Sequence, residues 1–418
     1  MNHQDGKYKK EIRYYIQFFI WIIVAIVIGV VGGIIGTIFH TQIEHAAQAN
    51  KSIDWLIYLL PLAGIVIVFT YHRFGVRQDP GTNLILKSTH TDSKVPFRLI
   101  PLIIISTVIT HLFGASAGRE GAALQVGGSL GSTLGNILKF NDQDRRITVI
   151  TGMAAVFSAM FGTPVAATVF SMEVVSVGNL QYAAFVPAII ASIIAEYVTF
   201  KMGGHKTIYV VDLNHKLSLD YLVRVSILGI IVGIVAILFC ILMHKTAQLL
   251  KKYFENAYLR IVVGASIIVV FTIIIGNRDY NGAGTGMIEQ SLGQPIVWYA
   301  FIIKMIFTAI SIGSGFKGGE IVPTLFIGAT LGNMLSSILG LPFGLSAAVA
   351  MIALFCGVVN APLSSIILAV ELFGTGNISY FAVACAISYV ISRYYSLYSA
   401  QIIVQDKMMQ KDIFKKAE

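Results

Sequence analysis

Long apolar runs occupy most of the chain, and the polar stretches between them are short. Many runs fall below the ~20 residues that a helix needs to cross a bilayer, and glycine or proline interrupts several. Broken segments are tolerated at membrane depth only where protein buries them or where they line a cavity. The pattern therefore predicts a bundle of tilted, partly broken helices. The predicted membrane segments are 14–39, 53–71, 97–113, 147–160, 164–176, 181–200, 220–245, 260–276, 296–312, 321–338, 343–357, 362–373 and 379–395.

Four longer polar stretches, 77–94, 140–146, 203–218 and 277–294, are predicted to be connections between these helices. Glycines four residues apart let two helix backbones approach closely, which favours a tightly packed bundle. Such pairs are Gly29/Gly33, Gly32/Gly36, Gly127/Gly131 and Gly328/Gly332.

Composition narrows the class of protein further. Hydrophobic residues make up 56% of the 418, and charged residues only 12%, about half the share in a soluble globular protein. These values exclude a soluble enzyme and a nucleic-acid-binding module. The net charge of +9 gathers beside the first and last apolar runs. Positive residues beside a span stay in the cytoplasm, so we expect a multi-pass cell-membrane protein with both termini cytoplasmic. These cations are Lys7, Lys9, Lys10, Arg13, Lys407, Lys411, Lys415 and Lys416.

The two halves of the chain contain similar sequences in the same order. AAVFSAMFGTPVAATVFSMEVVSVGN, around Pro164, parallels IALFCGVVNAPLSSIILAVELFGTGN, around Pro362. GREGAALQVGGSLG (118–131) parallels GEIVPTLFIGATLG (319–332), and PGTNLI (80–85) parallels AGTGMI (283–288). Three blocks in one order indicate an internal duplication. Similarity alone leaves open whether the halves are parallel or inverted, since both occur in transporters.

Glu120 is the first candidate functional residue. An ionised carboxylate at membrane depth costs about 3 kcal/mol on insertion scales, so such a residue is a functional candidate by default. The glycines beside it, Gly118 and Gly121, let backbone amides approach a ligand. A helix that starts here would aim its N–H groups at the same point, which attracts anions. The alternative is a surface pair between Glu120 and Arg119.

Glu320 follows the same design in GFKGGEIVP, with glycines before it and a helix start after it. Its alternatives are a charge at a helix N-terminus or a pair with Lys317. When the two halves are aligned, Glu320 falls one position away from Glu120. This place in the repeat favours a functional role for Glu320.

The remaining polar candidates are weaker. Thr82 and Asn83, after Gly81, can donate hydrogen bonds to an anion, whereas the matched Gly284-Thr285-Gly286 is compatible with an ordinary turn. Glu173 and Glu371 end apolar helices and are interpreted as solvated charges. His40, Glu44 and His45 have metal-like spacing but no third strong ligand nearby, so no metal site is predicted.

From about residue 55 to 402, these motifs resemble the CLC family of chloride channels and proton-coupled anion antiporters. GREGAALQ is similar to the family's gating segment, which puts the gating glutamate at Glu120. Gly81-Thr82-Asn83 falls at the serine loop, and GGEIVP is similar to the GxFxP segment, with Gly319, Ile321 and Val322 in the anion-binding stretch. Leu397-Tyr398-Ser399-Ala400 resembles the segment with the central tyrosine, Tyr398.

Departures from the family pattern point to one branch. Ala122 replaces the proline after GREG, Thr82 the central serine and Ile321 the phenylalanine of GxFxP. Val174 stands at the inner proton-transfer glutamate of the chloride antiporters. These changes resemble the fluoride-exporting CLC-F branch, in which a second glutamate, here Glu320, takes part in proton coupling.

The resemblance implies an all-α membrane protein of two inverted repeats, with one anion pathway per subunit, in a homodimer. We expect a basic tail (1–13), two transmembrane halves (14–203 and 204–399) and a short basic C-terminal tail (400–418). The expected function is export of fluoride in exchange for protons, without cofactor or metal. The anion-binding set would be Gly81, Thr82, Asn83, Gly118, Arg119, Gly121, Gly319, Ile321, Val322 and Tyr398.

Three alternatives stay open on the sequence. A chloride/proton antiporter would let chloride compete with fluoride. A passive channel would not pump fluoride uphill when a pH gradient is imposed. A membrane-embedded enzyme would need a nucleophile–base set or a metal triad, and the sequence displays neither.

Overall fold

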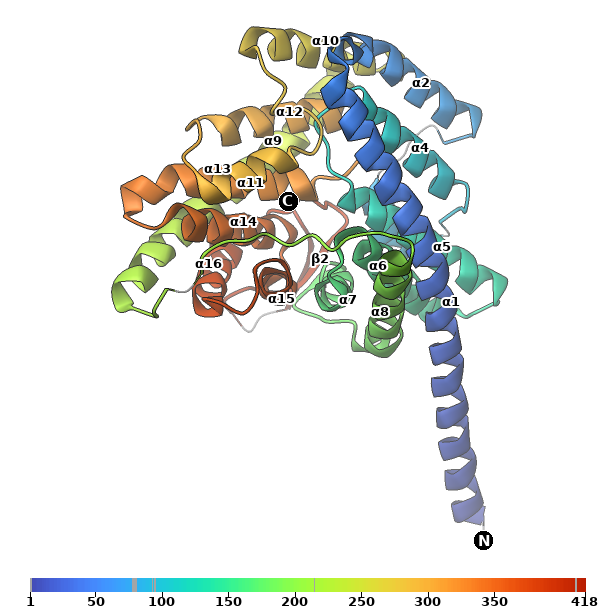
Figure 1. The fold of residues 1–418 in the computed structure, drawn as a ribbon. Coiled ribbons are helices and arrows are strands. Elements are labelled where there is room, and N and C mark those ends of the chain that lie inside the picture. Colours follow the sequence, from blue (N-terminus) through green and yellow to red (C-terminus); the bar gives the residue numbers. More distant parts are fainter. Residues whose placement is uncertain (1, 77–80, 92, 94, 214, 410–411) are drawn as a thin grey trace.

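The chain folds into a mostly helical bundle, seen in Figure 1. The computed structural model describes residues 2–76, 81–91, 93, 95–213, 215–409 and 412–418, without the side chains of 2–13. Pro80 of the first PGTNLI motif therefore lies outside the described residues. The first half comprises α1 (Asn2–Ser52), η1 (Asp54–Leu59), α2 (Leu60–Arg73), α3 (Thr82–Ser88), α4 (Leu99–Leu112), α5 (Glu120–Ile137), α6 (Asp142–Phe161), α7 (Pro164–Glu173), β1 (Ser176–Val177), η2 (Tyr182–Ala184) and α8 (Phe185–Lys201).

The second half is almost entirely helical and ends in two strands. It comprises α9 (Leu219–Tyr253), α10 (Ala257–Ile275), α11 (Thr285–Gly293), α12 (Ala300–Ser314), α13 (Ile321–Leu339), α14 (Phe343–Val359), α15 (Pro362–Phe373), α16 (Ile378–Ile391), β2 (Ile402–Gln405) and β3 (Asp412–Lys416).

The predicted membrane segments coincide largely with helices, but the 18-residue helix α5 was not among them and the predicted connection 140–146 contains the start of α6. Further differences concern α1, α3 and α11. The first helix, α1, continues far beyond 14–39 at both ends, and its N-terminal part projects from the bundle (Figure 1). The predicted connections 77–94 and 277–294 each contain a helix, α3 and α11, too short and too polar to give a clear apolar run. Within the described residues, six helical segments are long and apolar enough to cross a membrane.

The two halves are related by inversion. Helix α7 of the first half packs against its repeat mate α15. Glu173, at the end of α7, accepts hydrogen bonds from the first amides of α15, and Glu371 of α15 accepts them from the first amides of α7. The two helices are therefore antiparallel and exchange equivalent contacts, as a two-fold axis requires. This geometry selects the inverted arrangement that the sequence left open.

Equivalent helix pairs in the two halves pack backbone to backbone. A Cβ atom at Gly127 or Gly131 of α5 would lie 2.2 or 2.0 Å from a carbonyl oxygen of α6. In the other half, Cβ atoms at Gly328 and Gly332 of α13 would collide with the α14 backbone. Glycine at these positions is thus required by close approach, which confirms the inference drawn from their spacing.

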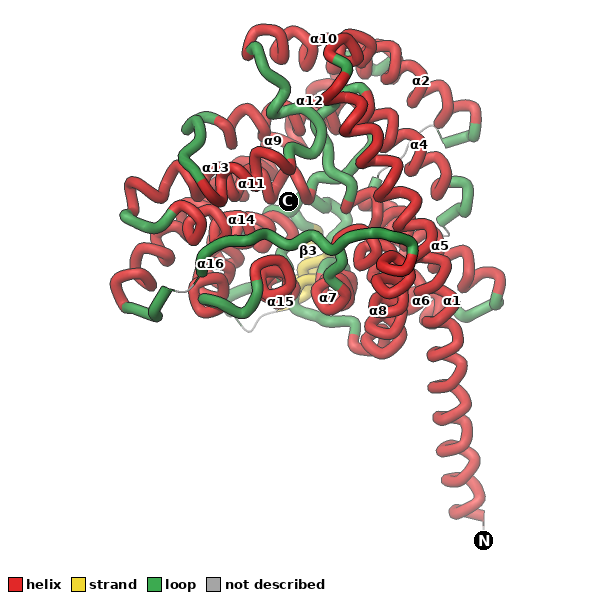
Figure 2. The backbone as a smooth tube through the Cα atoms, in the orientation of Figure 1, coloured by secondary structure: helices red, strands yellow, loops and turns green. Residues whose placement is uncertain are grey.

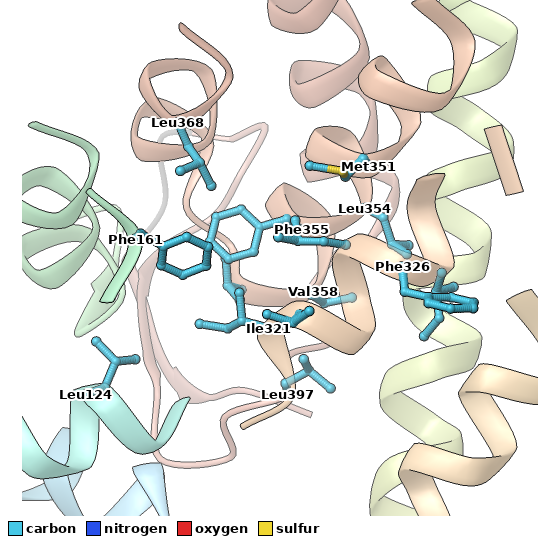
Figure 3. Packing of buried hydrophobic residues seen from close by; sticks show 14 of the residues in the cluster. Leu124, Phe161, Ile321, Phe326, Met351, Leu354, Phe355, Val358, Leu368 and Leu397 are labelled. Carbon is cyan, nitrogen blue, oxygen red and sulfur yellow. The ribbon is translucent and has the colours of Figure 1, made fainter. Parts of the chain in front are cut away.

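Apolar side chains fill the space between the two halves. Phe157 of α6, Phe170 of α7 and Phe355 of α14 contact one another in series, with ring centroids 5.3 and 5.4 Å apart. Ile321, at the start of α13, lies fully buried in the same core, close to Val358 and Phe355 in Figure 3. The side chain that replaces the family phenylalanine therefore belongs to the packing that fixes the start of α13.

A small sheet follows the helices, and the sequence did not predict it. Strand β2 pairs in parallel with β1 and antiparallel with β3 (yellow in Figure 2). Strands this short carry little periodicity, and their partner β1 lies more than 200 residues away in the chain, so no local signal could reveal them. The described residues of the C-terminal segment, 400–409 and 412–418, thus pack on the bundle, although the fold remains mostly helical.

Candidate functional site

The two glycine-rich motifs meet at the centre of the molecule. The N–H of Gly118 donates to the carbonyl oxygen of Gly319 at 2.6 Å, and the N–H of Gly319 donates back at 2.7 Å. A Cβ atom at Gly319 would lie 2.3 Å from the backbone nitrogen of Gly121, so only glycine permits this approach. The bridge places the N-terminal ends of α5 and α13 side by side.

Glu120 is the first residue of α5 and has no exposed surface. Its carboxylate accepts the backbone N–H of Arg119 at 3.0 Å and the Nε–H of the same arginine at 3.3 Å. The pair with Arg119 therefore exists, but it is buried rather than at the surface. A carboxylate at the N-terminus of a helix is also stabilised by the helix dipole.

Glu320 immediately precedes α13 and follows Gly319 of the glycine bridge. Its Oε2 atom is buried and has no hydrogen-bond partner among the described residues. The same atom would lie 3.1 Å from a Cβ atom at Gly121. Lys317, the suggested partner, lies with its Nζ atom 4.5 Å from the ring centre of Tyr71. A buried carboxylate oxygen without a partner is a place where a proton can reside.

The first turns of α5 and α13 supply amide groups at the same point. Gly118 and Gly319 use their N–H groups on each other. The next amides, those of Gly121 and Ala122 on α5 and of Ile321 on α13, belong to first turns, in which no intrahelical acceptor exists. Two helix N-termini that converge in this way favour an anion between them.

Thr82 and Asn83 connect α3 to the other site segments. The hydroxyl of Thr82 donates to the carbonyl oxygen of Gly121 at 3.4 Å and accepts from Nε2 of Gln125 at 3.3 Å. Oδ1 of Asn83 accepts the N–H of Ala400 at 2.9 Å. Gln125 was not predicted, and a lone glutamine in a glycine-rich helix gave no signal for it.

Tyr398 is buried, and its hydroxyl has no hydrogen-bond partner among the described residues. Tyr398 lines the same cavity as Glu320. The phenol group therefore has a hydrogen-bond donor to offer in that cavity.

Two cavities approach this centre from opposite ends of the bundle. One, of about 750 Å³, is lined by Gly81, Thr82, Asn83, Gln125, Glu320 and Tyr398, and it lies at the N-terminal end of α10. We call it the tyrosine-side cavity. The other, of about 770 Å³, lies at the C-terminal end of α10 and beside the end of α1. Helix α10 is about 28 Å long at 1.5 Å per residue, close to the thickness of a bilayer core. Glu120 lines neither cavity.

The structure corrects the interpretation of Glu173 and Glu371 as solvated charges. Glu173 is buried and accepts from the N–H groups of Leu363 and Ser364 at 3.1 and 2.9 Å. Glu371 accepts from the first amides of α7 at 3.1 and 2.8 Å. Each carboxylate satisfies amides that a helix start would leave unpaired.

His40 and Glu44 form a hydrogen-bonded pair instead of a metal site. Nε2 of His40 lies 2.9 Å from Oε1 of Glu44. Among the described residues, no group of three or more His, Cys, Asp or Glu side chains could hold a metal ion.

Comparisons with known proteins agree with this geometry. The sequence matches the family "Voltage gated chloride channel" over residues 63–393. A "Chloride/fluoride channel protein" from Pseudomonas syringae pv. tomato is 38% identical over 377 residues, which cover 88% of this chain and 83% of that protein.

Among solved structures, a CLC-type fluoride/proton antiporter superposes with a TM-score of 0.90 at 32% identity, covering 93% of this chain and 98% of the other. A slow cyanobacterial Cl⁻/H⁺ antiporter shares the fold, with a TM-score of 0.75 at 21% identity, over 89% of this chain and 94% of the other. The chain therefore belongs to the voltage gated chloride channel (CLC) family of membrane transport proteins and has its fold.

Proposed function

We propose that this protein exports fluoride in exchange for protons. The observation that carries the proposal is the position of two buried carboxylates, Glu120 and Glu320, each within two residues of the Gly118–Gly319 bridge, with Glu320 lining the tyrosine-side cavity. The likeness to a CLC-type fluoride/proton antiporter supports the choice of substrates.

Glu120 acts as the gate. When ionised, its carboxylate takes the place of an anion at the N-terminal end of α5, where amides and the helix dipole favour negative charge. Protonation removes this charge and weakens the attraction between the side chain and the start of α5. The side chain then swings away and a fluoride ion takes its place. Anion and carboxylate compete for one position, so their movements are coupled.

Glu320 carries protons between Glu120 and the tyrosine-side cavity. It lines that cavity, and its unpartnered Oε2 atom lies against Gly121, the residue after Glu120. This position suits a second proton carrier. Val174 has no titratable group at the position where the chloride antiporters carry their inner proton glutamate, so the proton needs another route in this chain.

Fluoride is small and strongly hydrated, so its site must replace water with hydrogen-bond donors. The free hydroxyl of Tyr398 and the first-turn amides of α5 and α13 supply them. Thr82, Asn83 and Gly81 shape the same cavity, and Gly118 and Gly319 hold the two helix starts together. Arg119, Gly121, Ile321 and Val322 complete the proposed anion-binding set.

The tyrosine-side cavity faces the cytoplasm in this proposal. The C-terminal end of α1 lines the other cavity, and residues 397–399, which precede the basic C-terminal segment, line the tyrosine-side cavity. This agrees with the basic residues beside the first and last membrane segments. The same family relationship supports a homodimer in which each subunit has its own pathway.

Purified protein in liposomes tests the proposal, with fluoride flux and pH recorded together. An imposed inward proton gradient should drive fluoride out against its own gradient. Fluoride flow that never exceeds its electrochemical equilibrium would instead identify a passive channel, the activity in the printed name of the Pseudomonas relative. Equal transport of chloride in competition would identify a chloride/proton antiporter.

A further inference from the structure

The buried gate residue Glu120 is connected to the protein surface through charged side chains. Arg119 holds its carboxylate, with Nε at 3.3 Å from Oε1. The guanidinium also reaches toward Glu44 of α1, with Nη1 at 3.9 Å from Oε1 of Glu44. Nε2 of His40 in turn lies 2.9 Å from Oε1 of Glu44. One cation thus lies between two carboxylates, one in the anion pathway and one outside it.

These two carboxylates differ in their access to water. Glu120 has no exposed surface, whereas the Glu44 side chain is 52% exposed; that of Arg119 is 13% exposed. A largely buried cation is costly when its counter-charge disappears. When Glu120 takes up a proton, Arg119 loses the charge that compensates it. Among the described residues, Glu44 is the other carboxylate within 4 Å of the guanidinium, so it can replace that charge.

We propose that Glu44 is an exchange partner for Arg119. When Glu120 becomes neutral, the guanidinium of Arg119 pairs with Glu44 instead, and this makes proton uptake by Glu120 easier. This inference rests on the proposed role of Glu120 as the proton-accepting gate. Arg119 transfers no proton itself; it changes partners. Glu44 and His40 are positioning residues, because they touch neither the anion nor the proton in transit.

Other charged groups around the cluster do not offer the same exchange. Helix α5 contributes Arg119 and Glu120, and α4 contributes His111, which lies within electrostatic range of Arg119. Helix α6 presents the carbonyl of Met160 to His40. The other contacts of α1 with α6 and α8 include alanines such as Ala155 and Ala191 and an uncharged hydrogen bond from Thr37 to Thr199.

His40 fixes the position of Glu44. It is buried, and its Nε2 atom lies at hydrogen-bond distance from Oε1 of Glu44. A hydrogen bond from a buried ring restricts the carboxylate of Glu44 to the side that faces Arg119. Glutamine at position 40 can keep a donor, whereas leucine cannot.

The experiment measures fluoride/proton exchange in liposomes with the same pH on both sides, over a range of pH. For Glu44→Gln we expect the pH of half-maximal rate to fall by about half a unit, the size that a half-exposed ion pair supports. The number of protons moved per fluoride should stay unchanged. His40→Leu should shift the profile in the same direction, and His40→Gln should restore it. Glu289→Gln, which neutralises an exposed carboxylate on α11, is the matched control and should leave the profile in place.

Two results separate this inference from the function on which it rests. If Glu120→Gln keeps proton coupling, the gate assignment itself fails. If Glu120→Gln abolishes coupling while Glu44→Gln and His40→Leu keep the wild-type pH profile, the exchange of partners is wrong and the gate assignment stands. Should Glu44→Gln not fold, the comparison of His40→Leu with His40→Gln decides alone.

Discussion

Gly118 and Gly319 exchange two backbone hydrogen bonds, although 200 residues separate them in the chain. At this bridge, as at the contact of α7 with α15, the two halves of the duplication meet through equivalent groups. It fixes the distance between the starts of α5 and α13, and therefore between the two carboxylates that follow, Glu120 and Glu320.

Replacement of Glu120 by glutamine should abolish proton coupling, because the amide has nearly the same shape but cannot titrate. Fluoride movement should continue without proton movement. Simultaneous recording of fluoride and pH in liposomes checks this. Uphill proton transport in exchange for fluoride by this variant would contradict the gate assignment.

Glu320→Gln should also lose coupled proton transport, since its buried Oε2 atom could no longer accept a proton. The same recordings apply, with Glu255→Gln, an exposed carboxylate far from the bridge in sequence, as the control. Unchanged proton flux would leave Glu320 with a structural role at the start of α13.

Gly121→Ala should inhibit transport strongly. The new Cβ atom would lie 2.8 Å from Cα of Gly319 and 3.1 Å from Oε2 of Glu320, so the two helix starts must separate. Overpacking of this kind costs about 1–3 kcal/mol. Gly293→Ala is the matched control because a Cβ atom there meets nothing within 4 Å. Equal flux in the two variants would mean that the close approach at Gly121 is dispensable.

Loss of the Glu173 carboxylate should destabilise the protein without any direct effect on the anion. For Glu173→Ala we expect a loss of about 2 kcal/mol, because two buried amides of α15 lose a charged acceptor. Glu173→Gln should cost less, since its amide oxygen can still accept. Thermal unfolding in detergent measures both. Equal stability of Glu173→Ala and wild type would show that water replaces the carboxylate.

Attachment of the C-terminal strands should depend on pH through Lys407. Its Nζ atom donates to the carbonyl of Tyr389 at 2.6 Å and to Oγ of Ser392 at 3.0 Å. Burial lowers the pKa of Lys407 to about 7, below that of an unfolded lysine, about 10.4. Between these values the detached tail binds more protons than the packed tail, so packing should strengthen as pH rises from 7 to 10. Hydrogen exchange of residues 402–405 measures this, and Lys407→Met should remove the rise.

The sequence predicted the parts of the site that have a local chemical signature. Glu120 and Glu320 stood out because carboxylates are rare in apolar segments, and the repeat placed them one register step apart. The pairing of Gly118 with Gly319 could not be predicted, because it depends on how two distant segments fold back on each other. The role of Gln125 and the contact of Arg119 with Glu44 were not predicted for the same reason, because the partners of a long side chain depend on the tertiary structure.

The interpretation of Glu173 and Glu371 failed for a related reason. A glutamate at the end of an apolar helix is usually in water, and the local pattern gave no sign of another helix start beside it. The order of the membrane segments, by contrast, followed from hydropathy alone, because each span must satisfy its own backbone in the bilayer.

The reciprocal contacts of Glu173 and Glu371 have a consequence for biogenesis. Each half-chain contains a helix whose opening amides are satisfied by an acid from the other half. A half synthesised by itself would insert into the bilayer with those amides bare. Its helix would therefore be completed only by a second half of opposite orientation.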